Sequence, residues 1–457
     1  MIGKENIIKS FARKVGIDGA IAYSSSARII QAAANFIVLF FIASLLSPAE
    51  QGFYYTFGSI AGIQVFFELG FTGIMTQYVA HEVVHLKLND LNYYDGEDRY
   101  ISRLSYLIRF CLKWYTVITV LFFIIVILVG FVFFSHYDAE GERTSWKGPW
   151  VLMSVATAIK LFQTPFNSIL IGLGKIKEMN KVLFFQQLFI PSSLIIGLFL
   201  GMELYVVGAS ILVGVCIWFF YVLKSHHFRI LYNLWIHPIT EKISYMKEIF
   251  PYQWKIALSW ISGYFIFQMF NPVLFATEGA VVAGQMGMTI SILSGIQALA
   301  LSWQNTKVPI YSGYIELKQF AELDRLFKLT TKQMLFVSFS LYFLFFALVF
   351  VVDIFDIAIF GIDLAGRVLE VPMLILMTIA VFLNQIIYSW ATYLRCHKQE
   401  PFLVLSVVEG LACLLSTLLL GNLYGLQGIV IGYLLIIIVQ TIWAYSIFTH
   451  KKNEWHG

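Results

Sequence analysis

The sequence is short of charge. Only 13% of its 457 residues are charged, whereas 59% are hydrophobic and 17% are aromatic. The mean hydropathy is +0.77. Ordinary soluble domains carry about 25% charged residues, so this composition excludes a soluble globular protein. The net charge of +4 is too small to indicate a nucleic-acid partner, and a mild excess of this kind is typical of cytoplasmic loops.

Cysteines are few, and the motifs of several enzyme classes are missing. The four cysteines lie inside or at the ends of apolar segments and show neither paired nor metal-like spacing: Cys111, Cys216, Cys396 and Cys413. We expect free thiols, no disulfide, no metal site and no cofactor. No nucleotide-binding motif is present, so ATP is not expected to drive the protein directly. No cleavable signal peptide is predicted, and the first apolar segment is expected to act as the insertion signal.

Long apolar segments are abundant. A membrane span needs roughly 20 apolar residues at about 1.5 Å of rise each. The segments lack the alternation of barrel strands, and only helices or closed barrels satisfy the backbone in lipid. The sequence therefore predicts an all-α polytopic membrane protein with about twelve transmembrane helices, at residues 19–46, 52–80, 106–134, 149–172, 180–201, 205–223, 252–276, 281–305, 333–352, 370–395, 401–421 and 427–448.

Lysine and arginine predict the orientation, because they are enriched in cytoplasmic loops. Basic residues gather in alternate loops, whereas the opposite side holds only Arg143, Lys147 and Arg367. We expect a cytoplasmic (inner) membrane protein with both termini in the cytoplasm.

Short sequence repeats divide the chain. Residues 59–64 read SIAGIQ and residues 291–297 read SILSGIQ, and six helices follow the same order in each half. An even number of helices per half predicts parallel repeats around a central cavity suited to alternating access. We expect an N-terminal lobe at 1–224, with an amphipathic start and helices 1–6, and a C-terminal lobe at 225–457 with helices 7–12.

Polar side chains recur at helical spacing inside several predicted spans. A charge in the middle of a membrane costs about 2.5–3.5 kcal/mol on insertion scales, so such residues are functional candidates. The candidate substrate-binding residues lie on helices 1, 4, 7 and 8: Arg28, Gln31, Asn35, Lys160, Gln163, Asn167, Lys255 and Gln297. The deep carboxylates are Glu68 and Glu409, which are candidates for ion coupling or for counter-ions.

Structural interpretations of these residues remain open. Lys160 can pair with Glu68, Arg28 and Lys255 can extend to the membrane surface, and Glu409 can be a protonated carboxyl between helices. If the cations instead face a cavity, they favour an anionic cargo, because Arg and Lys bind phosphate. Amides and hydroxyls beside them suit sugars, so the pattern favours a phosphate-linked sugar with a lipid tail.

Two segments carry a family resemblance. Residues 46–73 read LSPAEQGFYYTFGSIAGIQVFFELGFTG, and residues 251–260 read PYQWKIALSW. Together they resemble the bacterial polysaccharide and O-antigen flippases of the multidrug, oligosaccharidyl-lipid and polysaccharide exporter superfamily.

The resemblance implies a flippase that moves undecaprenyl-diphosphate-linked oligosaccharide across the cytoplasmic membrane for lipopolysaccharide or other surface polysaccharide assembly. It implies a cationic central cavity, which Arg28 and Lys160 would supply. It also implies membrane lipids, a polysaccharide polymerase and chain-length machinery as partners, and no nucleic acid.

Two other functions remain open. A cation-coupled multidrug antiporter of the same fold needs deep carboxylates; helix 1 has none between Asp18 and Glu50, but Glu68 keeps this alternative open. A membrane polysaccharide polymerase, ligase or acyltransferase is less favoured, because the external loops are short and most of the nine histidines lie at predicted cytoplasmic ends.

Overall fold

The computed structural model describes residues 31, 34–137, 144–241, 243–355, 358–359, 362–363, 365–397 and 399–456. Within these residues seven helices are long and apolar enough to cross a membrane, or eight if one bent pair counts as a span. The predicted all-α, multi-pass membrane fold is confirmed.

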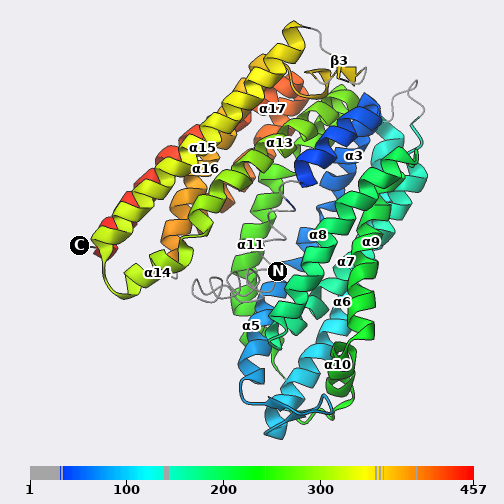
Figure 1. The fold of residues 1–457 in the computed structure, drawn as a ribbon, viewed down its shortest axis with the longest axis vertical. Coiled ribbons are helices and arrows are strands. Elements are labelled where there is room, and N and C mark those ends of the chain that lie inside the picture. Colours follow the sequence, from blue (N-terminus) through cyan, green and yellow to red (C-terminus); the bar gives the residue numbers. More distant parts are fainter. Residues whose placement is uncertain are drawn as a thin grey trace, which may run out of the picture. The chain divides into compact units, whose positions relative to one another are not determined.

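The described helices follow the chain in the order shown in Figure 1. Residues Ala34–Leu45 form a short apolar helix. The other α-helices are α3 (Pro48–Ala61), α4 (Gln64–Glu68), α5 (Phe71–Val83), α6 (Asp98–Tyr137), α7 (Lys147–Gly172), α8 (Ile176–Phe199), α9 (Tyr205–Lys224), α10 (His226–Ile236), α11 (Phe250–Phe267), α12 (Phe270–Glu278), α13 (Ala280–Asn305), α14 (Val308–Glu316), α15 (Phe320–Ile354), α16 (Val371–Cys396) and α17 (Leu403–His456).

The remaining elements are short. Tyr245–Ile249 forms the π-helix η1, and Ala365–Arg367 forms the 3₁₀ helix η2. Two antiparallel pairs join β1 (Lys87–Leu88) to β2 (Tyr94–Asp95) and β3 (Ala358–Ile359) to β4 (Ile362–Asp363).

Two predicted spans share α17. This element has 54 residues, far more than one span requires, and it is interrupted at Gly425, where φ is 55° and ψ is −135°. The backbone N–H of Leu426 donates to Glu278 Oε1 over 2.5 Å, which ties the interruption to the end of α12. The predicted spans 401–421 and 427–448 therefore lie on either side of one glycine turn.

The span predicted over 52–80 is not continuous. It consists of α3, α4 and α5, with a bend of 40° between Pro48–Glu68 and Phe71–Val83. Leu69 and Gly70 at the bend have positive φ values of 48° and 67°. Gly70 packs so closely on Ile256 that an added Cβ would lie 2.3 Å from Ile256 Cγ2. Glycine permits both the left-handed backbone and this approach.

The chain forms two compact units. The first unit includes the described residues within 64–132 and 145–257, and the second includes those within 39–63 and 258–456. The lobes at 1–224 and 225–457 stay a prediction.

Arginine contacts hold residues 226–257 within the first unit. Arg103 on α6 donates to Glu82 Oε1 on α5 over 2.8 Å and to Glu248 Oε2 on η1 over 2.9 Å. Arg109 on α6 donates to the carbonyl oxygens of Trp235 and His237 over 2.8 and 2.7 Å. The connector after α9 is therefore fixed to the start of α6.

Glycines bring α3 and α13 together inside the second unit. A Cβ added to Gly52 would lie 1.9 Å from the carbonyl oxygen of Ala280, and one added to Gly284 would lie 2.8 Å from the nitrogen of Gly52. Gln51 Nε2 donates to the carbonyl of Gly284 over 2.9 Å. The two backbones are in direct contact, as small residues allow in membrane helices.

We expect Gly52→Ala to destabilise the protein by about 1–3 kcal/mol, because its methyl group has to push the two backbones apart. Gly58→Ala on the same helix is the matched control, since an added Cβ there meets nothing within 4 Å. The thermal unfolding midpoint of both purified variants checks this, and equal midpoints would contradict the close packing.

Candidate functional site

Glu68 lies directly before the break in the second span. It is the last residue of α4, and its carboxylate accepts a hydrogen bond of 2.8 Å from the hydroxyl of Thr72 on α5. The side chain is half-buried. Broken helices inside membranes occur where the chain lines a water-filled space or is covered by protein, so the break itself marks a functional candidate.

Lys160 lies on α7 within electrostatic reach of Glu68. No ion pair within 4.0 Å joins the two described side chains. The side chain of Lys160 is exposed. Lys160 lies in the middle of α7, which covers the predicted span 149–172 but is not among the seven helices counted above. If α7 crosses the membrane as the sequence predicts, an exposed ammonium there must meet water, because lipid would cost several kcal/mol. This geometry favours a partly balanced cation at an aqueous surface over a closed structural pair.

The helices α5 and α7 run side by side in the same direction. The hydroxyl of Thr76 donates to the carbonyl of Ser168 over 3.2 Å, a sequence separation of 92 residues. Gly172 packs on Thr76 and Val79. Glu68 and Lys160 have the same separation of 92 residues, but they lie two turns away from this contact, and Glu68 stands before the break that precedes α5.

The polar residues of α7 point in two directions. Lys160, Thr164 and Asn167 share one helical face, and all three retain exposed surface. Gln163 is only 8% exposed, and its Oε1 has no hydrogen-bond partner among the described residues. The structure therefore keeps Lys160 and Asn167 together and turns Gln163 into the protein interior.

The other candidates of the first span are described in part. Gln31 and Asn35 are exposed helical residues. Arg28 lies outside the described residues, and so does the side chain of Lys255. Their cargo-binding roles stay predictions.

In the second unit the polar side chains of the predicted spans form hydrogen bonds between neighbouring helices. Gln297 on α13 donates to the carbonyl of Val381 on α16 over 3.4 Å. Gln304 donates to the Ser389 hydroxyl over 2.5 Å, and Asn384 donates to the Tyr433 hydroxyl over 3.2 Å. Here hydrogen bonding between helices, the structural alternative, accounts for the pattern.

Glu409 on α17 is a second buried carboxyl. It is 6% exposed and has no ion pair with a described residue. The phenols of Tyr388 and Tyr433 lie within its electrostatic reach. Gln385, which precedes Tyr388 on α16, is fully buried, and both of its amide atoms lack described partners. Sequence analysis identified Glu409 but missed the tyrosines, because hydropathy does not distinguish them from core aromatics.

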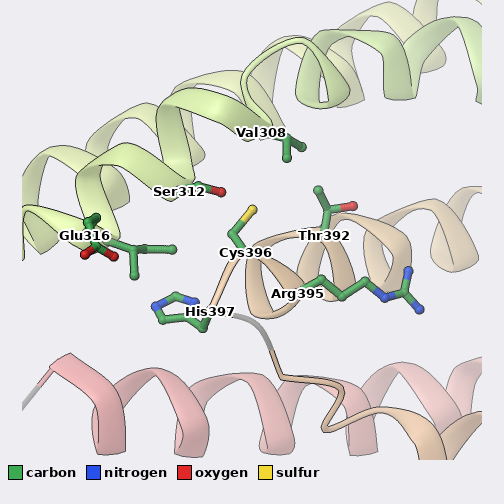
Figure 2. Close-up of a pocket in the computed structure, with 8 residues that line it drawn as sticks. Val308, Ser312, Glu316, Thr392, Arg395, Cys396 and His397 are labelled. Atoms are coloured by element: carbon green, nitrogen blue, oxygen red, sulfur yellow. The ribbon is translucent and has the colours of Figure 1, made fainter. Parts of the chain in front are cut away.

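A cavity of about 620 Å³ opens between α14 and α16. Figure 2 shows Ser312 and Glu316 on one helix and Thr392, Arg395 and Cys396 on the other. Arg395 forms two hydrogen bonds of 2.7 and 2.8 Å with Glu400, so its charge is already balanced. Sequence analysis missed this cavity, since half of it comes from a connector helix. Its mixed charges do not match an anionic cargo.

Comparisons with known proteins are informative at the level of structure. No protein-family model matches the chain, and no curated protein matches it. The fold is similar to the multidrug transporter DinF-BH of the MATE family, with a TM-score of 0.59, 15% identity, and coverage of 95% of this chain and 96% of that one.

Two further solved structures are similar. An inward-facing MATE family transporter of the MOP superfamily gives a TM-score of 0.54 at 13% identity, covering 92% of this chain and 99% of that one. The lipid II flippase MurJ in an inward closed conformation gives 0.53 at 14% identity, covering 93% and 86%.

These likenesses establish the fold of MOP-superfamily transporters. The neighbours are transporters and a flippase, not enzymes. The resemblance found in the sequence is confirmed at the level of the superfamily fold.

The exposure pattern of α7 gives a direct test. In a background with Cys216 and Cys396 changed to serine, we expect Lys160→Cys and Asn167→Cys to react with a water-soluble maleimide, because thiolates form only in contact with water. We expect Gln163→Cys to stay unlabelled because it is buried.

Ile196→Cys on α8 is the control for a lipid-facing position, since Ile196 is 58% exposed and apolar. If this control labels as strongly as Lys160→Cys, the aqueous surface at Lys160 is refuted.

Proposed function

We propose that this protein is a flippase that carries a lipid-linked oligosaccharide, with its diphosphate, across the cytoplasmic membrane by alternating access. The observation that carries the proposal is the exposed side chain of Lys160 in the middle of α7, near Glu68 but outside ion-pair distance. Such a cation favours an anionic cargo.

The side chains around Lys160 suit the rest of that cargo. Thr164 and Asn167 extend the same accessible face of α7 with a hydroxyl and an amide. These groups donate and accept hydrogen bonds with sugar hydroxyls. A diphosphate near the lysine and a sugar along the next turns fit one continuous surface of the first unit.

The fold supports a transport function, and two classes of cargo are compatible with it. MurJ, one structural neighbour, is a lipid II flippase, and another neighbour is a multidrug transporter. The cation at Lys160 favours the phosphate-bearing lipid. Glu68 and Glu409 favour the cation-coupled multidrug antiporter as the second candidate, since carboxyls of this kind carry protons or sodium in exchange for cargo.

Cellular placement follows the same proposal. The basic bias in alternate loops supports an inner-membrane protein with both termini in the cytoplasm. A polysaccharide polymerase and chain-length machinery would then act on the flipped cargo at the outer face.

We expect Lys160→Ala to lower surface polysaccharide at least about tenfold at normal protein levels, because a charge-assisted hydrogen bond contributes about 1.5–3 kcal/mol. Lys160→Arg should retain part of the activity, since the charge persists while its geometry changes. Polysaccharide extraction from complemented deletion cells measures both.

Lys328→Ala on α15, an exposed basic residue far along the chain, is the control and should export normally. Normal export by Lys160→Ala would refute an anionic cargo at this residue, whereas lost drug resistance with normal polysaccharide would favour the antiporter.

The roles of Glu68 and Glu409 can be tested separately. If Glu409 carries a coupling proton, Glu409→Gln should abolish transport driven by a pH gradient in proteoliposomes while cargo binding survives. Glu68→Gln should strengthen binding of an anionic lipid, because it removes the negative charge near Lys160.

Glu316→Gln, an exposed carboxylate at the end of α14, is the matched control and should transport at the normal rate. Gradient-driven transport at full rate by Glu409→Gln would exclude a coupling role for Glu409.

A further inference from the structure

A second cavity lies at the beginning of α6 in the first unit, apart from Lys160 and Glu68. Its volume is about 480 Å³. Its walls come from one face of α6 and from the segment after α10 (both helices are labelled in Figure 1). The lining residues include Tyr106, Arg109, Phe110, Lys113, Trp114 and Ile239. The α6 residues follow the i, i+3, i+4, i+7 spacing of a single helical face.

Three aromatic rings line this face one turn apart. Tyr106 and Phe110 stack with ring centroids 6.2 Å apart at an interplanar angle of 17°, and Phe110 and Trp114 stack at 6.2 Å and 9°. Tyr245 of η1 packs on Phe110 at 5.6 Å. The rings form a continuous apolar wall at the end of the spanning helix, where aromatic residues meet the membrane interface.

Two cations flank the rings. Lys113 is exposed and has no hydrogen bond or ion pair with another described residue. Arg109 is held by the carbonyl oxygens of Trp235 and His237, and its guanidinium lies 5.8 Å from the Trp235 ring. Because these partners are neutral, the arginine is fixed in place and its charge is not cancelled.

The nearby carboxylates are occupied elsewhere. Asp98 pairs with His237 at 2.9 Å, Glu241 pairs with Arg99 at 3.1 Å, and Glu248 pairs with Arg103. No carboxylate is among the lining residues that the structure describes for this cavity. The cavity is therefore cationic, unlike the cavity at α14, where Glu400 balances Arg395.

We propose that this cavity binds a net-anionic phospholipid of the surrounding membrane. The headgroup phosphate lies between Arg109 and Lys113, and an acyl chain follows the rings of Tyr106, Phe110 and Trp114. Beyond Trp114 the same helix exposes apolar side chains such as Val117 and Leu121, so the chain continues along a lipid-facing surface. A zwitterionic headgroup gains less here, because no carboxylate among the described lining residues is present to receive its ammonium.

Native mass spectrometry of the full-length protein tests the proposal with phosphatidylglycerol and phosphatidylcholine of matched chains. We expect tighter binding of phosphatidylglycerol. Lys113→Gln should weaken that binding about fivefold and leave phosphatidylcholine unchanged, as expected for one basic residue near a lipid phosphate. Lys113→Arg should bind normally.

Lys224→Gln is the matched control. Lys224 is also an exposed lysine of the first unit; it is the last residue of α9, and its ammonium lies 4.3 Å from the Phe220 ring centroid. Equal binding of the two lipids, or an equal loss in Lys224→Gln, would overturn the proposal. Displacement of the lipid by free glycerol phosphate at the same concentration would also overturn it, because the site would then recognise phosphate without a chain. Thermal unfolding of Lys113→Gln should match the unchanged protein, which confirms that the variant is folded.

Discussion

The low polarity of the membrane interior is the constraint on which the rest of the structure depends. Backbone groups in lipid must bond within helices, and charges must find water or a partner. The helix is interrupted at Leu69–Gly70, next to the half-buried Glu68. The exposed Lys160 lies on α7, which packs against α5. A broken helix, a carboxylate and a cation outside ion-pair distance are costly in lipid, and together on paired helices they indicate a hydrated surface.

Paired helices carry charged side chains in the first unit and neutral polar side chains in the second. In the first, α5 and α7 are joined by Thr76 and Ser168, and Glu68, directly before α5, lies within electrostatic reach of Lys160. In the second, α13 and α16 are joined by neutral contacts such as Gln304 with Ser389. These contacts are between neutral groups, whereas charged groups retain a long-range field. The proposed cargo surface therefore lies in the first unit, whereas the buried carboxyl of the second unit is Glu409.

Long apolar segments were sufficient to predict the helical membrane fold and most helix positions, because span length follows from bilayer thickness. The break at Leu69–Gly70 was not predictable, since it is stabilised by the contact of Gly70 with Ile256, far along the chain. Helical spacing identified the stripe on α7, but it did not separate Gln163 from Asn167. Those residues differ in burial, which depends on tertiary packing and not on helical spacing. Likewise, the attachment of residues 226–257 to the first unit depends on Arg103 and Arg109, whose partners are distant in sequence.

In the proposed transport cycle, the position of Glu68 would link cargo binding at Lys160 to the charge of the carboxylate. A cargo phosphate bound at Lys160 would compete with the Glu68 carboxylate for the same cation, so each weakens the other's interaction. Neutralising Glu68 would then strengthen cargo binding, and by thermodynamic reciprocity bound cargo would favour neutral Glu68 by the same free energy. Thr72 opposes this exchange, because its hydroxyl donates to the charged carboxylate. In this proposal Lys160 and Glu68 would link the binding of an anionic cargo to the protonation of one carboxylate.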